Sequence, residues 1–403
     1  MKELELLAPA GDFEKLVTAY DFGADAAYVG SERFGLRSAA GNFNFDQLAR
    51  ARQLAAERER KLYLTLNAYL VSGQFDQLAE DLERLKPLDL DAYIVTDPGV
   101  LSLIRRIDPE REIHLSTQSN TTNIEAIRFW QQFGVSRVNL ARELTLEDMQ
   151  AIGQNCDVEI EAFVHGAMCV AFSGRCLLSA AMNGRSANSG ACSHPCRWNY
   201  SLVEEKRPGE YYPIEEDQHG TYLMNSRDLR LIEYLPEMAA AGVNSFKIEG
   251  RMKSRYYVAV VTRVYREALD RYQENPSAWT CDPLWLAELD KVSHRPYDHG
   301  FLFGHEDAKI HSADTHYQRS FDFVGQVLSL ESDGTALVEG KNRFFPRERL
   351  EIFGPKMRQA EFEVGDVTNE VGDALEVVQP NARVLMKLPA GSQAGDMMRR
   401  EKE

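Results

Sequence analysis

Four cysteines lie close together in the middle of the sequence and can bind a metal centre. Cys169, Cys176, Cys192 and Cys196 are separated by six, fifteen and three residues. Four thiolates bind either tetrahedral zinc or a 4Fe–4S cluster. Zinc ribbons usually pair cysteines as C-x2-C knuckles, which this stretch lacks, whereas wide spacing among glycines suits a cluster. The spacing therefore favours iron–sulfur, and a zinc site or four buried apolar thiols remain alternatives.

The rest of the chain indicates a reducing compartment. The N-terminus has no apolar leader with a small-residue cleavage site, and no run of 18 apolar residues occurs. We therefore expect a cytoplasmic protein with no membrane partner, in which thiols stay reduced. The two remaining cysteines, Cys156 and Cys281, stand alone and are interpreted as structural.

The net charge argues against generic nucleic-acid binding. The 403 residues carry a formal charge of −16, whereas nonspecific binding relies on Lys and Arg neutralising phosphates. An RNA partner would therefore have to meet a local basic surface. The fingerprints G-x-G-x-x-G and G-x-x-x-x-G-K-[ST] are absent, so we predict no nucleotide-binding loop.

Short β-rich runs alternate with amphipathic helical segments over the first 270 residues. Eight such runs occur, at residues 4–8, 26–29, 61–66, 93–95, 113–116, 138–140, 158–164 and 245–248. Alternation indicates a parallel sheet, and a count of eight indicates a closed (β/α)8 TIM-like barrel. A doubly wound open sheet is the alternative.

Two further segments complete the expected organisation. A cysteine-bearing insertion, at about 167–225, separates the seventh and eighth strands, is longer than an ordinary loop and shows little helical period. From residue 313 the pattern changes to short alternating runs separated by Gly, Asp and Asn, which predicts a small all-β barrel. We expect a barrel domain at 1–312 and a β domain at 313–403.

The cysteine segment resembles a known family. EAFVHGAMCVAFSGRCLLS, from Glu161 to Ser179, matches the signature of peptidase family U32, the collagenase-like family, and SFKIEGRMKS and FVGxV…VEGKNRF agree with one branch of it. That branch resembles the prephenate-dependent tRNA uridine hydroxylases. The resemblance spans essentially the whole chain. It implies a barrel, a 4Fe–4S cluster on the four cysteines and a small C-terminal β domain.

The resemblance implies a tRNA-modifying enzyme that forms 5-hydroxyuridine at the wobble position with prephenate as cosubstrate. Two alternatives stay open. One is a collagenase-like peptidase, although G-x-S-x-G and H-E-x-x-H are absent and the cysteines are spaced like ligands. The other is an iron–sulfur subunit of an oxygen-independent quinone-ring hydroxylation system, which would have a stable heteromeric partner.

Basic residues in the insertion and at strand ends are candidates for substrate binding. A guanidinium group binds a carboxylate or a phosphate in a bidentate manner, and prephenate is a dicarboxylate. In a barrel, residues that follow the strands meet at the catalytic end. The predicted substrate-binding residues are Arg175, Arg197, Arg251, Lys247, Gln118 and Asn120. Each arginine can instead pair with a local Glu, and Gln118 and Asn120 can be ordinary loop residues.

Three residues are candidates for the chemical step: Arg142, Glu249 and His165. Arg142 follows the sixth strand. Glu249 can act as a base, and pairing with Lys247 or Arg251 is the slightly favoured alternative. His165 ends the seventh strand, four residues before Cys169, and a structural role is favoured over a proton shuttle.

Overall fold

The computed structural model describes residues 4–36, 41–168, 176, 178–185, 188, 193, 202–203, 211–212, 216–217, 220–221, 227–304 and 317–402. The chain forms two compact units. The first comprises residues 1–20, 24–253 and 294–317, and the second 21–23, 254–293 and 318–403. The expected boundary at 312–313 falls within 305–316, outside the described residues, so its position stays a prediction.

Eight parallel strands close into a barrel in the first unit. They are β1 Glu5–Pro9, β2 Ala26–Gly30, β3 Lys61–Leu66, β4 Ala92–Val95, β5 Glu112–Leu115, β6 Val135–Asn139, β7 Glu159–Ala167 and β13 Val243–Ile248. Neighbours in this order are hydrogen-bonded, and β13 pairs with both β7 and β1, which closes the ring. The predicted TIM-like fold class is confirmed.

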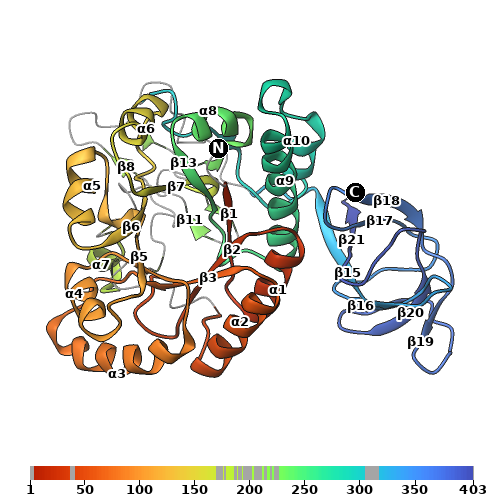
Figure 1. Cartoon of the computed structure of the whole chain (residues 1–403). Helices are drawn as coiled ribbons and strands as arrows, with labels where there is room; N and C mark the ends of the chain where they lie inside the picture. Colours follow the sequence, from red (N-terminus) through yellow and green to blue (C-terminus); the bar gives the residue numbers. More distant parts are fainter. Residues whose placement is uncertain are drawn as a thin grey trace. The chain divides into compact units, whose positions relative to one another are not determined.

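Helices follow the strands along the chain and lie outside the ring (Figure 1). They are α1 Phe13–Asp21, α2 Phe45–Glu57, α3 Phe75–Leu85, α4 Pro98–Ile107, α5 Ile124–Gln131, α6 Leu146–Gly153 and α8 Leu235–Ala240, with 3-10 turns at η1 Ser72–Gln74, η2 Lys86–Leu88, η3 Thr117–Ser119 and η7 Ile232–Tyr234. Side-chain caps fix where several begin: Thr145 caps α6 by accepting from the Asp148 backbone N–H.

The chain between β7 and β13 extends the barrel beyond its eight strands. The end of β7 pairs antiparallel with β12 Asp228–Arg230, which pairs in parallel with β14 Tyr297–Asp298. The insertion also contains elements that the sequence did not predict: α7 Leu178–Asn183, β8 Leu202–Val203, β9 Tyr211–Tyr212, β10 Glu216–Asp217 and β11 Gly220–Thr221. Each has six residues or fewer, too few to produce a clear hydrophobic period.

The second unit contains a seven-stranded antiparallel sheet. Its elements are α9 Arg255–Glu274, η8 Pro276–Ala278, α10 Pro283–Leu289, β15 Phe321–Leu330, β16 Thr335–Gly340, β17 Arg349–Phe353, β18 Gln359–Glu363, β19 Val367–Asn369, β20 Arg383–Lys387 and β21 Met397–Glu401. The strand order is β18-β17-β21-β15-β16-β20-β19. Alternate residues of several strands, such as Val338, Ile352 and Val384, form one buried core.

A buried ion network ties the helices of the second unit to its sheet. Glu288 of α10 accepts from Arg263 of α9 and, over 2.8 Å, from Arg399 of β21. All three side chains are buried. No helix in the described ranges is long and apolar enough to cross a membrane.

Candidate functional site

A polar pocket opens at the carboxyl ends of the barrel strands. Its empty volume, counted out to the open mouth, is about 580 Å³. The strands contribute Tyr28, Thr65, Ile94, Asn139, Phe163 and Lys247, and the loops after them contribute Asn67, Ser116, Thr117, Gln118, Arg142, Glu249 and Arg251. The loops at this end carry the active site in characterised TIM-barrel enzymes. The pocket brings together Arg142, Lys247, Glu249, Arg251 and Gln118, which were predicted separately.

Arg251 is held by hydrogen bonds to two other segments of the barrel unit. Its guanidinium donates to Thr65 Oγ1 over 3.1 Å and to Asn42 Oδ1 over 2.5 Å. Gly30, the last residue of β2, leaves room for the guanidinium, because a Cβ there would lie 2.1 Å from Arg251 Nη2. These hydrogen bonds orient the guanidinium at the wall of the pocket.

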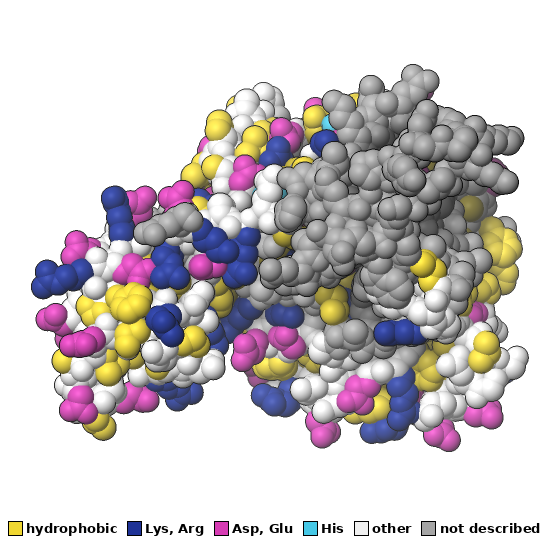
Figure 2. Space-filling view, turned by 180° about the vertical axis from the view of Figure 1, so that it is seen from behind, with side chains coloured by type: hydrophobic (Ala, Val, Ile, Leu, Met, Phe, Trp, Pro, Cys, Tyr) yellow, Lys and Arg dark blue, Asp and Glu magenta, His cyan; other side chains and the backbone are white. Residues whose placement is uncertain are grey.

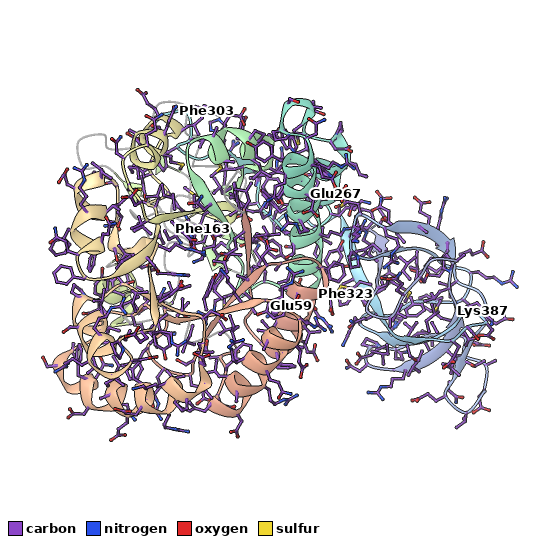
Figure 3. All side chains as sticks on the ribbon, viewed as in Figure 1. Glu59, Phe163, Glu267, Phe303, Phe323 and Lys387 are labelled. Atoms are coloured by element: carbon purple, nitrogen blue, oxygen red, sulfur yellow. The ribbon has the colours of Figure 1, made fainter. Side chains whose placement is uncertain are left out.

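Arg142 enters the pocket from the turn after β6. Its Cζ lies 3.9 Å from the centre of the Phe163 ring, a cation–π contact. The described residues provide no carboxylate within ion-pair distance of Arg142. The side chain of Phe163 lies within the ring of strands (Figure 3). Arg142 is therefore positioned by an aromatic face and is available to bind a carboxylate.

Lys247 points from β13 into the same pocket and is paired with a buried carboxylate. Its Nζ donates to Glu161 Oε1 over 2.6 Å, and both side chains are almost fully buried. The ring centres of Tyr28 and Phe163 lie 4.6 and 5.4 Å from Nζ. Burial lowers the pKa of Lys247. The charge and hydrogen bond of Glu161 raise it, but burial has the larger effect, so the pKa is lowered overall.

Beneath the pocket, charged side chains continue through the barrel interior. Arg137 of β6 binds Glu5 of β1 in a bidentate manner and also binds Glu159 over 2.6 Å. Glu5 also accepts from the Ser245 hydroxyl over 2.9 Å and from the Tyr63 hydroxyl over 2.6 Å. Burial raises the pKa of Glu5, but the charge and hydrogen bonds of Arg137 outweigh it and hold that pKa at about 2. Glu5 is therefore ionised at neutral pH.

The sequence did not reveal this interior network. Arg137 and Glu5 lie within strands, where buried charged residues are rare. In a sequence, a charged residue at such a position looks like an exposed residue of an edge strand. One signal was available: Glu5, Arg137 and Glu161 each lie within a predicted parallel strand whose other residues are mostly apolar. Charges at such positions must be paired inside a closed barrel.

A second, mostly apolar pocket shares a wall with the first. Its empty volume, again including open space, is about 310 Å³. Arg142 and Phe163 line both pockets, and the second is completed by apolar residues that include Leu140, Met149 and Leu231. A ligand whose carboxylate reaches Arg142 can therefore place an apolar ring against these side chains.

His165 lies outside the lining of the polar pocket. It is buried at the end of β7, with its ring 5.3 Å from that of Tyr297. Burial lowers the pKa of His165 to about 3, against the nearby Asp228 carboxylate, which raises it. Asp228 binds Arg295 over 3.0 Å. A buried imidazole outside the pocket lining suits the structural role favoured from the sequence, and that role stays a prediction.

Two amide side chains near the mouth have buried oxygen atoms that accept no hydrogen bond from the described residues. Asn120 adopts a left-handed conformation with φ of 53° after η3, and Asn139 ends β6. Asn139 lines the polar pocket and Asn120 does not. Asn139, which the sequence analysis did not select, is therefore a further candidate ligand contact.

Part of the cysteine site lies outside the described residues. This applies to Cys169, Cys192 and Cys196 and to Arg175 and Arg197. Cys176 is described and half-buried. Its backbone N–H donates to Asn188 Oδ1 over 3.4 Å, and the Asn188 carbonyl accepts from Tyr69 N–H over 3.3 Å. Because Tyr69 follows β3 and donates from its hydroxyl to the Gln118 carbonyl, Cys176 lies at the pocket end of the barrel.

Fold and pocket together define a (β/α)8 barrel protein with a cationic pocket at the carboxyl ends of its strands. Residues 11–312 match the model of peptidase family U32, and residues 319–399 match the model of the family's C-terminal domain. The chain belongs to peptidase family U32.

Curated relatives cover nearly the full length of the chain. It is 36% identical to tRNA hydroxylation protein P1 of Bacillus subtilis, over all of this chain and 96% of that protein. It is 36% identical to tRNA hydroxylation protein P of Escherichia coli, over 93% of this chain and 91% of that one. It is 30% identical to a collagenase of Porphyromonas gingivalis, over 96% of this chain and 89% of the other.

Proposed function

We propose that this protein is a tRNA-modifying hydroxylase that forms 5-hydroxyuridine at the wobble position, with prephenate as cosubstrate and a 4Fe–4S cluster as cofactor. The observation that carries the proposal is the pocket, where three cations meet at the barrel end that also holds Cys176. The names of the two tRNA hydroxylation relatives, which match along nearly their whole length, support RNA as the substrate.

The two adjoining pockets suit a dicarboxylate that carries an apolar ring. Arg251 is fixed by Thr65 and Asn42, and Arg142 is fixed by Phe163, so each guanidinium can accept a carboxylate without a large loss of side-chain freedom. The apolar pocket beyond Arg142 provides a surface for the ring. Prephenate has both features, two carboxylates and a six-membered carbon ring.

Four cysteine thiolates are the donor set that a 4Fe–4S cluster requires. Two hydrogen-bonded serines support their convergence, because Ser193, next to Cys192, donates its N–H over 3.0 Å to Ser179, three residues beyond Cys176. Cys169, Cys176, Cys192 and Cys196 would hold the cluster. When bound, it would supply electrons or a site for an oxygen-containing group.

The chain's own residues have separate tasks in this proposal. Arg142 and Arg251 hold the carboxylates, and Gln118 and Asn139 orient the ligand by hydrogen bonds. Glu249, at the pocket wall, is the candidate for accepting a proton from the substrate. The buried carboxylate of Glu161 holds the Lys247 side chain at the pocket floor.

A loop of the second unit is suited to contact tRNA. Between β16 and β17, Arg343, Phe345 and Arg347 are exposed at alternate positions. Within the described residues, neither arginine forms a side-chain ion pair. Unpaired guanidiniums bind phosphates, and an exposed aromatic ring stacks on a base. The face of this unit seen in Figure 2 otherwise mixes acidic and basic side chains, so the contact would be local.

Nucleoside analysis tests the function. A bacterial strain that lacks its own relative, and any redundant route, should lose 5-hydroxyuridine derivatives from tRNA and regain them when this chain is expressed. Mass spectrometry of digested tRNA measures both. Unchanged nucleosides after expression would contradict the proposal, and hydrolysis of gelatin by the purified protein would favour the peptidase alternative instead.

A further inference from the structure

Lys247 has the surroundings of a lysine that reacts with a carbonyl group. Its ammonium lies at the floor of an open pocket, yet the side chain is only 5% exposed. Two aromatic faces and the carboxylate of Glu161 lie against it. Desolvation of this kind favours the neutral amine, which is the nucleophilic form.

Glu161 is placed to move the protons that such a reaction needs. Its Oε1 lies 2.6 Å from Lys247 Nζ, and it remains near Arg137, 3.6 Å away. A carboxylate next to the amine can accept protons from the nitrogen and pass them to the carbonyl oxygen and to the leaving hydroxyl.

The nearby cations select the kind of carbonyl compound. Arg142 contacts the same Phe163 ring as Lys247, and Arg251 lines the same pocket. A ligand held by its carboxylate on one guanidinium would place an adjacent carbonyl carbon close to the pocket floor. The fitting class is therefore a small 2-oxo acid, in which carbonyl and carboxylate carbons are bonded directly.

We propose that Lys247 captures a 2-oxo acid as an iminium. The amine nitrogen forms a bond to the carbonyl carbon while Glu161 takes a proton from the ammonium group. Glu161 gives that proton to the carbonyl oxygen to form the carbinolamine, then takes a second proton from the nitrogen and gives it to the carbinolamine hydroxyl, so that the C–O bond breaks and one water molecule leaves. No oxidant or reductant is needed. The product keeps one positive charge on nitrogen, so the ion pair with buried Glu161 survives the reaction.

This inference deepens the proposed function, because prephenate is itself a 2-oxo acid. The identity of the physiological ligand rests on that proposed function. The iminium would anchor the cosubstrate and withdraw electrons from its carbon skeleton. The covalent step nevertheless belongs to the pocket alone and needs no RNA. It can therefore be tested separately from hydroxylation.

Borohydride trapping of the full-length, anaerobically purified protein tests the step. The protein is incubated with pyruvate or phenylpyruvate and treated with borohydride, which converts an iminium to a stable amine. Intact mass should show one adduct per chain, and peptide mass spectrometry should place it on Lys247. Phenylpyruvate should label more efficiently, because its ring can lie against the apolar side chains that line the second pocket. Phenyllactate, which has no ketone, should give no adduct.

Matched variants separate reaction from structure. Lys247→Arg keeps the charge beside Glu161 but cannot form an iminium, so it should fold and give no adduct. Lys341→Arg, a surface lysine of the second unit paired with Glu339, should label like the parent protein. Arg142→Gln should lower labelling at low ligand concentration by about tenfold, the value of one charge-assisted contact.

Two results would overturn the inference. One is an adduct that is absent, or spread over exposed lysines, in a protein that circular dichroism shows to be folded. The other is hydroxylation by Lys247→Arg at the parent rate. An adduct on Lys247 in a protein that leaves tRNA nucleosides unchanged would uphold the iminium and remove the hydroxylase proposal. Failed trapping with intact hydroxylation would do the reverse.

Discussion

At the scale of single residues, the pocket depends on how closely Arg251 packs against β2. The guanidinium occupies the space that a side chain at position 30 would need. The guanidinium donates to Thr65 of β3 and to Asn42 of the loop after β2, so contacts with three segments orient one charge. An anion site built in this way is sensitive to a single methyl group.

The variant Gly30→Ala should therefore weaken ligand binding while the fold persists. The new Cβ would meet Arg251 Nη2 at 2.1 Å, and the flexible end of the arginine would move rather than the backbone. Loss of one charge-assisted contact should weaken prephenate binding about tenfold, measured by isothermal titration calorimetry. Gly73→Ala, where no atom lies within 4 Å of the new Cβ, should bind like the parent. Equal affinities of both variants would contradict this account of Arg251.

The interior pair of Glu5 and Arg137 predicts how stability depends on pH. The pKa of Glu5 is lowered from 4.5 to about 2 in the folded protein. The unfolded chain binds a proton at Glu5 more readily than the folded protein does. The ionised carboxylate therefore contributes about 3 kcal/mol to the free energy of unfolding. This contribution is complete above pH 4.5 and disappears as the pH falls to 2.

Glu5→Gln should remove that contribution and flatten the acid branch of the stability curve between pH 4.5 and 2. Urea unfolding followed by circular dichroism at several pH values measures the slope. Glu125→Gln, an exposed residue of α5 paired with Arg128, is the control and should leave the slope unchanged. A slope that Glu5→Gln leaves intact would show that another carboxylate is responsible.

These residues also show what sequence reasoning can recover. Arg142, Lys247, Glu249 and Arg251 were selected because they end or follow predicted strands, and parallel strands bring such positions to one end of a barrel. Arg137 was missed because its partner Glu5 is 132 residues away in the sequence. Pairing inside a barrel depends on strand register, which one sequence does not reveal.

At the scale of elements, the loop between β16 and β17 carries the proposed RNA contact. The double variant Arg343→Glu/Arg347→Glu should weaken tRNA binding at least tenfold. It removes two phosphate contacts and the counterion release that accompanies each of them. Filter binding at several salt concentrations should show a shallower salt dependence. The control is the double variant Arg383→Glu/Lys387→Glu, which changes the net charge by the same amount but on β20. Figure 3 shows Lys387 at the edge of the sheet unit.

The control pair is needed because any added negative charge repels RNA. If both double variants lose affinity equally, the effect is general electrostatics and the loop has no special role. If only the loop variant loses affinity, Phe345→Ala should produce a further loss of about 1–3 kcal/mol per stacked base.

The buried network around Glu288 predicts how the second unit is stabilised. Burial raises the pKa of Glu288, but Arg263 and Arg399 outweigh it and lower that pKa to about 2. Glu288→Gln would leave two buried guanidiniums undercompensated and should destabilise this unit by about 3–5 kcal/mol. Hydrogen exchange should become faster in α9, α10 and β21.

Glu267→Gln provides the comparison for that experiment. Glu267 forms an i,i+4 pair with half-exposed Arg271 on α9, and such pairs contribute about 0.3–0.5 kcal/mol. Exchange rates in β21 should stay at the parent value in this variant. Similar exchange profiles for the two variants would contradict a central role for Glu288.

At the scale of the whole molecule, the fold and the presence of the insertion were predicted from the sequence, whereas the short elements inside the insertion were not. Eight short apolar runs locate the barrel because each strand is buried and each following helix is amphipathic. The short elements of the insertion lack such periodicity. The position of Cys176 depends on hydrogen bonds through Asn188 to Tyr69, which are contacts distant in sequence.

The most direct measurement compares two arginine variants in the strain that lacks its own tRNA hydroxylation protein. Arg142→Gln removes the pocket guanidinium, whereas Arg128→Gln removes an exposed one on α5. With equal protein levels, mass spectrometry of tRNA nucleosides should show 5-hydroxyuridine restored by the parent chain and Arg128→Gln, and reduced at least tenfold by Arg142→Gln. Full restoration by Arg142→Gln would contradict a catalytic role for the barrel pocket.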